Sequence, residues 1–193
     1  ATIVYANLAR AAFPEVPIVL GGMEASLRRF IHYDYQQAKL RSSVLVDAKA
    51  DLLVYGMGER AVLEIAARLR AGRNLRQIAG TCERLTDRER AERTGSQPEV
   101  ELPSWAEIAA HRQQFLSAEL EIDRRARALD AAALLQRQQS HWVLQNQPAA
   151  PLTPTEPLTA ITPLKSGLYL RARGQRYPAS ARPARPAACV PVQ

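Results

Sequence analysis

Two short segments place glycines and a glutamate where a β-strand is expected to end. The first is Leu20-Gly-Gly-Met-Glu24 and the second is Tyr55-Gly-Met-Gly-Glu59. Glycine at the carboxyl end of a parallel strand lets a ligand approach the backbone closely, and the helix that follows presents unpaired N–H groups. Both segments are therefore candidate sites for a bound cofactor. The candidate cofactor-binding residues are Gly21, Gly22, Glu24, Gly56, Gly58 and Glu59.

The same residues also have a purely structural interpretation. Neither segment matches GxxxxGKS/T or GxGxxG, the glycine motifs that hold phosphates. The glycines would then only permit tight turns between a strand and a helix. Glu24 and Glu59 would be carboxylates at helix N-termini, where the helix dipole favours negative charge. Both interpretations stay open.

A cluster of polar and aromatic side chains follows the first glycine segment directly. Such a cluster could line a pocket or bind an anionic group, and the alternative is an interdomain surface or a solvated helix face. The three histidines, His32, His111 and His141, are too scattered in sequence to predict a metal site. The cluster consists of Arg28, Arg29, His32, Tyr33, Asp34 and Tyr35.

No catalytic nucleophile is predicted, and no catalytic residue is assigned. The serines lack a GxSxG context, and neither cysteine has a histidine close in sequence. Cys82 and Cys189 are far apart and show no CxxC spacing, so neither a disulfide framework nor a zinc site is expected. Cys82 lies in a predicted strand, and we interpret it as a small core residue.

The elements that would position these residues follow from the hydrophobic pattern. Helical spacing predicts a helix over Thr2–Ala12, and a β-branched run predicts a strand at Pro17–Leu20. A helix over Glu24–Phe30 follows. A second strand at Asp51–Tyr55 is followed by an amphipathic helix over Arg60–Ala71. Two successive units of strand, glycine turn and helix predict a parallel α/β sheet.

The remaining chain is predicted in less regular pieces. Ser104 and Glu107 form a capping-box pattern that begins a long helix, which we expect to run to about Gln138, with a break as one alternative. The other predicted elements are a helix through Gln36–Val44, an edge strand at Thr81–Leu85, a polar connection at Thr86–Glu101 and a short strand at Trp142–Gln145.

The net charge of +7 is concentrated near the end of the chain. From Pro151 onward there are six basic residues and one acidic residue, and prolines are frequent, so this tail is expected to be disordered or extended. The charge motivates one alternative, a basic protein associated with nucleic acid. No apolar run approaches the roughly 20 residues of a membrane helix and no signal peptide begins the chain, so we expect a cytoplasmic location without a membrane partner.

Four segments of the first 60 residues belong together: Val4-Tyr-Ala-Asn-Leu-Ala-Arg10, Phe13-Pro-Glu-Val-Pro-Ile-Val-Leu-Gly-Gly-Met-Glu-Ala-Ser-Leu-Arg-Arg-Phe30, His32-Tyr-Asp-Tyr35 and Leu45-Val-Asp-Ala-Lys-Ala-Asp-Leu-Leu-Val-Tyr-Gly-Met-Gly-Glu-Arg60. On these segments the sequence resembles the YgiQ-type (UPF0313-like) family of radical SAM proteins. The resemblance implies the N-terminal region that precedes the catalytic core, with a Rossmann-like fold similar to cobalamin-binding domains. It also implies further strands before the first helix, so that the domain here is partial.

The resemblance implies cofactors that this chain is not expected to hold. In the family, a downstream CxxxCxxC motif supplies three thiolates to an iron–sulfur cluster that binds S-adenosylmethionine. This chain lacks that motif, so we expect no cofactor here and no catalysis by the chain alone. His32 is not followed by the DxHxxG pattern of base-off cobalamin sites, so cobalamin is an analogy of fold only. The expected partner is the missing radical SAM core domain, and nucleic acid is not the favoured partner.

The sequence thus predicts three regions. Residues 1–102 would form a partial Rossmann-like α/β domain, residues 103–150 a helical extension, and residues 151–193 a tail that is disordered or translated in a shifted frame. The leading hypothesis is an N-terminal accessory domain of a radical SAM iron–sulfur protein. The alternatives are a basic protein associated with nucleic acid and an α/β module that binds a nucleotide or another small molecule at the glycine turns.

Overall fold

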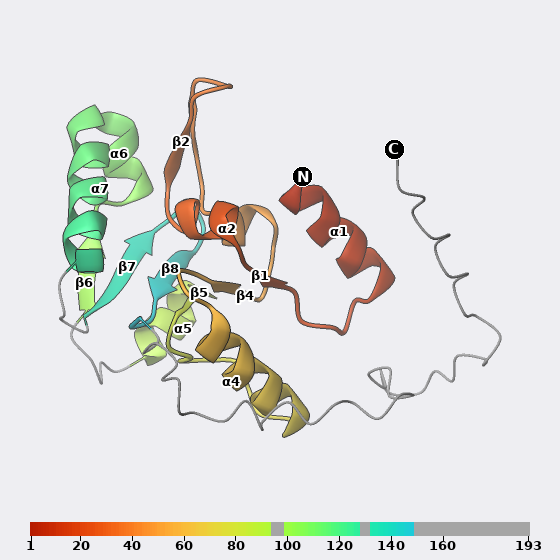
Figure 1. Ribbon diagram of the computed structural model, residues 1–193. Helices are drawn as coiled ribbons and strands as arrows, with labels where there is room; N and C mark the ends of the chain where they lie inside the picture. The colour runs from red at the N-terminus through yellow and green to blue at the C-terminus, as the bar shows by residue number, and fades with distance from the viewer. Residues whose placement is uncertain (94–98, 128–131, 149–193) are drawn as a thin grey trace, which may run out of the picture. The chain divides into compact units, whose positions relative to one another are not determined.

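A computed structural model describes residues 1–93, 99–127 and 132–148, all within one compact unit (Figure 1). The predicted tail, residues 151–193, lies outside the described residues. The helices are α1 (Thr2–Ala12), α2 (Met23–Leu27), α3 (Val44–Asp47), α4 (Glu59–Arg70), α5 (Asp87–Glu92), α6 (Trp105–Ala110) and α7 (Arg112–Arg127). The strands are β1 (Val19–Leu20), β2 (His32–Asp34), β3 (Lys39–Arg41), β4 (Leu52–Val54), β5 (Thr81–Leu85), β6 (Glu99–Leu102), β7 (Ala133–Arg137) and β8 (Trp142–Gln145).

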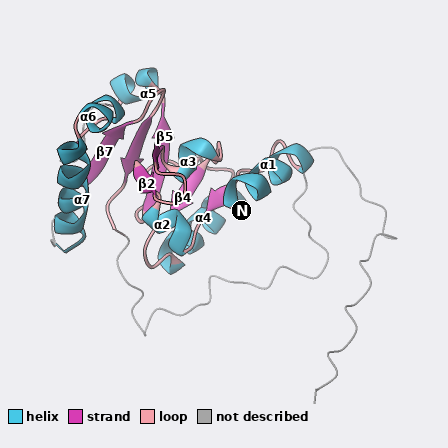
Figure 2. Cartoon of the chain, turned by 90° about the horizontal axis from the view of Figure 1, so that it is seen from above, coloured by secondary structure: helices cyan, strands magenta, loops and turns pink. Residues whose placement is uncertain are grey.

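The fold is α/β, with helices around a six-stranded sheet of order β1-β4-β5-β8-β7-β6 and a separate two-stranded sheet, β2-β3 (Figure 2). The first two units of strand, glycine turn and helix form in the predicted order, but β1 begins only at Val19 and α2 ends at Leu27, before the predicted end at Phe30. β1 and β4 are parallel neighbours, with Leu20 opposite Leu53. α1 spans the predicted residues, and α4 begins and ends within one residue of the prediction.

The prediction of a parallel sheet is wrong for the middle of the sheet. β5 is antiparallel to β4, and β8 is antiparallel to both β5 and β7. The reason is the connection after α4, which returns to the carboxyl end of β4, where the Tyr55 N–H donates to the Gly80 carbonyl at 3.0 Å. Ile78 stabilises this return because it is buried against Leu52 and Ile65.

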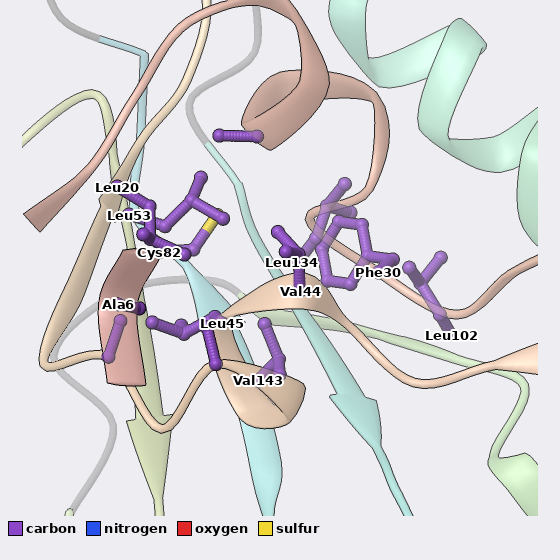
Figure 3. Packing of buried hydrophobic residues seen from close by; sticks show 13 residues of the cluster. Ala6, Leu20, Phe30, Val44, Leu45, Leu53, Cys82, Leu102, Leu134 and Val143 are labelled. Atoms are coloured by element: carbon purple, nitrogen blue, oxygen red, sulfur yellow. The ribbon is translucent and has the colours of Figure 1, made fainter. Parts of the chain in front are cut away.

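β5 is an interior strand and not the predicted edge strand. Its second neighbour is β8, and the register places Cys82 opposite Gln145. This pairing joins residues 57 to 63 positions apart, so a local sequence pattern carries no signal of it. Cys82 is fully buried, which confirms its interpretation as a core residue (Figure 3).

The helix predicted over Gln36–Val44 is wrong, because this segment forms the β2–β3 hairpin and the start of α3. The Asp34 side chain determines the turn: its Oδ1 accepts hydrogen bonds from the N–H groups of Gln36 and Gln37 at 3.1 and 3.2 Å. Ala38 completes the turn with a φ of 49°. Figure 1 shows the hairpin projecting from the body of the molecule.

The capping box at Ser104 and Glu107 is confirmed, but the helix that follows is shorter than predicted. It breaks at His111 into α6 and α7, and its predicted extension to Gln138 is wrong because Ala133–Arg137 is strand β7. The predicted polar connection at Thr86–Glu101 contains α5 and most of β6. The strand at Trp142–Gln145 is confirmed as β8.

Strands from both sides of residue 102 share the six-stranded sheet, since β6 pairs with β7. The proposed division into regions at residues 102 and 150 stays a prediction. The principal core lies between this sheet and α1, α2 and α3, and includes Leu45, Leu53 and Val143 (Figure 3). A second cluster, Ile31, Ile108 and Ala118, joins the base of the hairpin to α6 and α7.

Candidate functional site

The two glycine turns lie side by side at the carboxyl ends of β1 and β4, because these strands are parallel neighbours. Ser26 in α2 joins them. Its Oγ accepts a hydrogen bond from the Gly56 N–H at 3.1 Å and donates to the Gly22 carbonyl at 3.0 Å. Sequence reasoning missed Ser26, because nothing in the local pattern shows that the second turn packs on α2.

The glycines at this edge serve different purposes. Gly22 and Gly56 have φ values of 88° and 65°, a left-handed conformation that glycine adopts without strain. A Cβ on Gly21, Gly22 or Gly56 would meet no atom within 4 Å, so the space beside them is open. A Cβ on Gly58 would lie 2.8 Å from Val54 Cγ1. Glycine is therefore required at position 58 because the backbone packs closely against Val54. The cofactor role of these glycines stays a prediction.

The two candidate glutamates differ in how they are held. Glu24 Oε2 accepts a hydrogen bond from Thr2 Oγ1 at 2.5 Å, and its Oε1 accepts one from Arg28 Nη1 at 3.0 Å. Glu24 thus ties α1 to α2. Glu59 is exposed and is the first residue of α4, where the helix dipole favours its charge. A cofactor role for either glutamate stays a prediction.

A hollow of about 570 Å³ lies between α2 and the hairpin, next to the first glycine turn. It brings together five of the six residues of the predicted polar and aromatic cluster. The sixth, Arg29, lies within the fold: its Nε donates to Gln145 Oε1 at 2.7 Å and its guanidinium lies over the Tyr55 ring. The hollow is lined by Met23, Glu24, Leu27, Arg28, His32, Tyr33, Asp34, Tyr35 and Gln36.

Two buried glutamines, Gln136 in β7 and Gln138 directly after it, fix the hairpin wall of this hollow. Gln136 Oε1 accepts a hydrogen bond from the Ile31 N–H at 2.9 Å, just before β2. Gln138 Oε1 accepts one from the Ser43 N–H at 3.1 Å, just after β3. Gln138 Nε2 also donates to Gln136 Oε1 at 3.1 Å. Both ends of the hairpin are therefore held by the sheet, a feature missed when β7 was interpreted as helix.

Burial lowers the pKa of His32 below its ordinary value, and the nearby Arg28 acts in the same direction. The His32 ring is therefore neutral near pH 7. Its Nδ1 lies 3.4 Å from the Phe30 carbonyl oxygen, which can only accept, so Nδ1 carries the proton. The hydrogen bond from the Gln37 N–H is the main cause that lowers the pKa of Asp34, which also pairs with Arg41.

The described residues do not fit an iron–sulfur cluster. Cys82 is fully buried in β5, and burial raises the pKa of its thiol to about 12, whereas a cluster ligand is an accessible thiolate. Cys189 lies outside the described residues. In the part of the chain that the structure describes, no group of three or more His, Cys, Asp or Glu side chains is placed to hold a metal ion. None of the described helices is both long and apolar enough to cross a membrane.

Comparison with known proteins identifies the family. The model of the family described as "Radical SAM N-terminal" matches residues 1–182. UPF0313 proteins of Geobacter sulfurreducens and Thermotoga maritima are 46% and 45% identical to the chain over 159 and 161 residues, which is 81% of this chain in each case. The match covers 26% and 27% of those relatives, so the chain spans about a quarter of their length.

A UPF0313 protein of Methanocaldococcus jannaschii is 48% identical over 117 residues, covering 60% of this chain and 19% of the relative. No solved structure matches the chain significantly. The residues that carry the early resemblance, from Val4 to Arg60, include most of α1, β1, β4, both glycine turns and the walls of the hollow. The chain belongs to the Radical SAM N-terminal family and is a UPF0313-type sequence.

Proposed function

We propose that this chain is a noncatalytic accessory module that packs against the radical SAM core of a longer protein through the edge formed by the two glycine turns. Membership of the Radical SAM N-terminal family supports the proposal. So does the coverage of the relatives, which are about four times as long as the matched segment. The role of the module is to position the core and to form part of the wall of its substrate site.

The observation that best supports the proposal is that two methionine side chains are exposed to solvent at this edge. Met23 follows the first glycine turn and Met57 lies within the second, and they are the only methionines in the sequence. Their side chains are 80% and 79% exposed. Large apolar side chains that gather at an exposed edge mark interaction surfaces, and the flexible methionine side chain adapts to a partner. Because β1 and β4 are neighbours, both methionines belong to one surface.

Binding to the core tests this surface. The chain is mixed with the separately produced part of the Geobacter sulfurreducens relative that lies outside the match, and the affinity is measured by calorimetry. Met57→Asp places a charge in the proposed interface and is expected to weaken binding about tenfold or more. Leu116→Asp is the matched control, since Leu116 is 59% exposed on α7, at the opposite end of the sheet. Absence of binding, or a larger effect of Leu116→Asp, would contradict the proposal.

The noncatalytic part of the proposal has its own test. The resemblance implies a cluster held by three thiolates, and this sequence contains two cysteines. The isolated chain, treated anaerobically with iron and sulfide, is therefore expected to show no visible absorbance from a cluster. A stable cluster that disappears in Cys82→Ser would show that the chain carries metal chemistry itself. The free Cys82 thiol also agrees with the cytoplasmic location that we propose.

One observation favours a second function, the binding of a nucleotide or another cofactor at the glycine turns. The space beside Gly21, Gly22 and Gly56 is open, so a ligand could reach the backbone there. A panel of nucleotides and cofactors in a thermal unfolding assay tests this function, since a ligand that binds the folded state raises the midpoint. The absence of any rise would exclude it in favour of the docking role.

A further inference from the structure

The hollow between α2 and the hairpin has hydrogen-bond donors that no described residue uses. The Tyr33 and Tyr35 hydroxyls and the Gln36 side-chain amide make no hydrogen bond within the described residues. Arg28 donates through Nη1 to Glu24, which leaves its Nε and Nη2 hydrogens directed to no described acceptor. These groups can all donate to a ligand that enters the hollow.

The two carboxylates that line the same hollow are engaged within the protein. Both carboxylate oxygens of Glu24 accept hydrogen bonds, from Thr2 and Arg28. Asp34 accepts two backbone N–H groups through Oδ1, and its Oδ2 lies 3.7 Å from the Arg41 guanidinium. The Arg28 guanidinium is therefore the charged group of the lining that keeps N–H groups unused by any described residue, and a carboxylate or phosphate is the group that such N–H groups bind best.

The apolar part of the lining favours a ligand that also has an apolar body. Leu27 is 72% exposed and Tyr35 is 83% exposed, so both leave large apolar surfaces uncovered. A ring that covers the Tyr35 face and the Leu27 side chain would remove these surfaces from water. The cavity volume of about 570 Å³ lies in the range of sites for small molecules, roughly 300–1,000 Å³.

Both walls of the hollow are held in place before any ligand enters. Gln136 and Gln138 hold the two ends of the hairpin, as described above. On the other wall, Arg29 follows α2 and joins it to the sheet through Gln145. Walls fixed by separate contacts reduce the entropy lost on binding. The backbone of both walls is thus held in place without a ligand.

We propose that this hollow is a binding site for a small amphipathic anion, a carboxylate or phosphate attached to an aromatic or aliphatic body. Arg28 binds the anionic group, with the Tyr33 hydroxyl as a second donor. Tyr35 and Leu27 contact the body of the ligand. The hollow shares Met23 and Glu24 with the proposed docking edge, but ligand binding does not require docking and is measured on the chain alone, so either proposal can fail without the other.

The proposal is tested on the full chain by NMR titration of the backbone amides. The probes are phenyl phosphate and phenylacetate, which share a ring and differ in the anion, with inorganic phosphate and benzylamine as comparisons. Saturable shifts at α2 and the hairpin are expected for one or both aromatic anions, with a Kd on the order of 1 mM for ligands of this size. Inorganic phosphate is expected to bind about tenfold more weakly, because it has no apolar body.

Substitutions identify the groups responsible. Arg28→Gln is expected to raise the Kd of the aromatic anions about tenfold, and Arg28→Lys to restore part of the affinity because it keeps the charge. Tyr35→Ala should weaken binding and Tyr35→Phe should keep most of it. Arg88→Gln is the control, because Arg88 pairs with Glu92 at the same i,i+4 spacing as Arg28 with Glu24, but on α5, away from the hollow. Matching unfolding midpoints show that each variant is folded.

Three results would overturn the proposal. The first is the absence of saturable shifts with either aromatic anion up to about ten times the expected Kd. The second is equal or tighter binding of benzylamine, which would mean that the hollow selects a cation. The third is an unchanged Kd in Arg28→Gln, which would place the anion elsewhere.

Discussion

Replacing Gln136 by leucine should destabilise the chain by loosening the base of the hairpin. The side chain of Gln136 is fully buried and makes three hydrogen bonds: it accepts from the Ile31 N–H and from Gln138 Nε2, and it donates to the Pro103 carbonyl. Leucine has a similar volume but none of these groups. Ile31 is only 2% exposed, so its N–H would remain buried without an acceptor.

The magnitude follows from these contacts. A hydrogen bond of this kind contributes about 1 kcal/mol net, and a buried polar group left without a partner costs about 1–3 kcal/mol. The gain in apolar burial from leucine offsets part of the loss, so we expect a decrease of about 2–4 kcal/mol in the free energy of unfolding. In a chain of this length that corresponds to a fall in Tm of about 5–15 °C.

Urea denaturation followed by circular dichroism measures this change, with the slope against urea expected to stay constant. Gln113→Leu provides the control, since Gln113 is exposed on α7 and its side chain makes no hydrogen bond within the described residues. That control should change the stability by less than about 0.5 kcal/mol. If Gln136→Leu costs less than about 1 kcal/mol, or no more than the control, the buried glutamines do not hold the hairpin and the reasoning is refuted.

Three further predictions follow from the structure. Gly58→Ala should lower the free energy of unfolding by about 1–3 kcal/mol in urea titrations, because its Cβ would overlap a core side chain, whereas Gly21→Ala, which faces open space, should have little effect. In Cys189→Ser, the remaining thiol of Cys82 should react with a thiol reagent only as the chain unfolds, since it is buried with a pKa raised to about 12, and rapid reaction in native buffer would contradict this. The pKa of His32 is lowered on folding, so below the ordinary value of 6.5 the unfolded chain binds a proton more readily than the folded chain, and the free energy of unfolding should fall as the pH drops. Urea midpoints at about pH 7 and about pH 5 should therefore differ less in His32→Gln than in the parent chain.

The parts of the fold that the sequence predicted correctly are those with strong local signals. A β-branched run that ends in glycine marked β1 and β4, and a capping pattern marked the start of α6 at Ser104. The segment that becomes β7 is rich in alanine, leucine and glutamine, which are good helix formers. It is a strand because β6 and β8 pair with it on both sides, and such non-local pairing overrides the local preference.

The candidate site, like the fold, was predicted only where the local sequence carries a signal. The cluster from Arg28 to Tyr35 is dense in polar and aromatic residues, so the sequence alone marks it as a possible pocket lining, and the structure places most of it around one hollow. The hairpin that builds this hollow depends on Asp34 at the turn and on glutamines about 100 residues away. A helical interpretation of the same segment ignored the turn chemistry of Asp34 and could not include the distant glutamines.

Hydrogen exchange tests the central claim most directly, namely that the edge carrying the two glycine turns docks onto the radical SAM core. Exchange of backbone amides is measured for this chain alone and after mixing with the part of the Geobacter sulfurreducens relative that lies outside the match. The account predicts slower exchange at residues 21–24 and 56–59 in the mixture, with α7 unchanged. Unchanged exchange at both turns, or protection confined to α7, would contradict it.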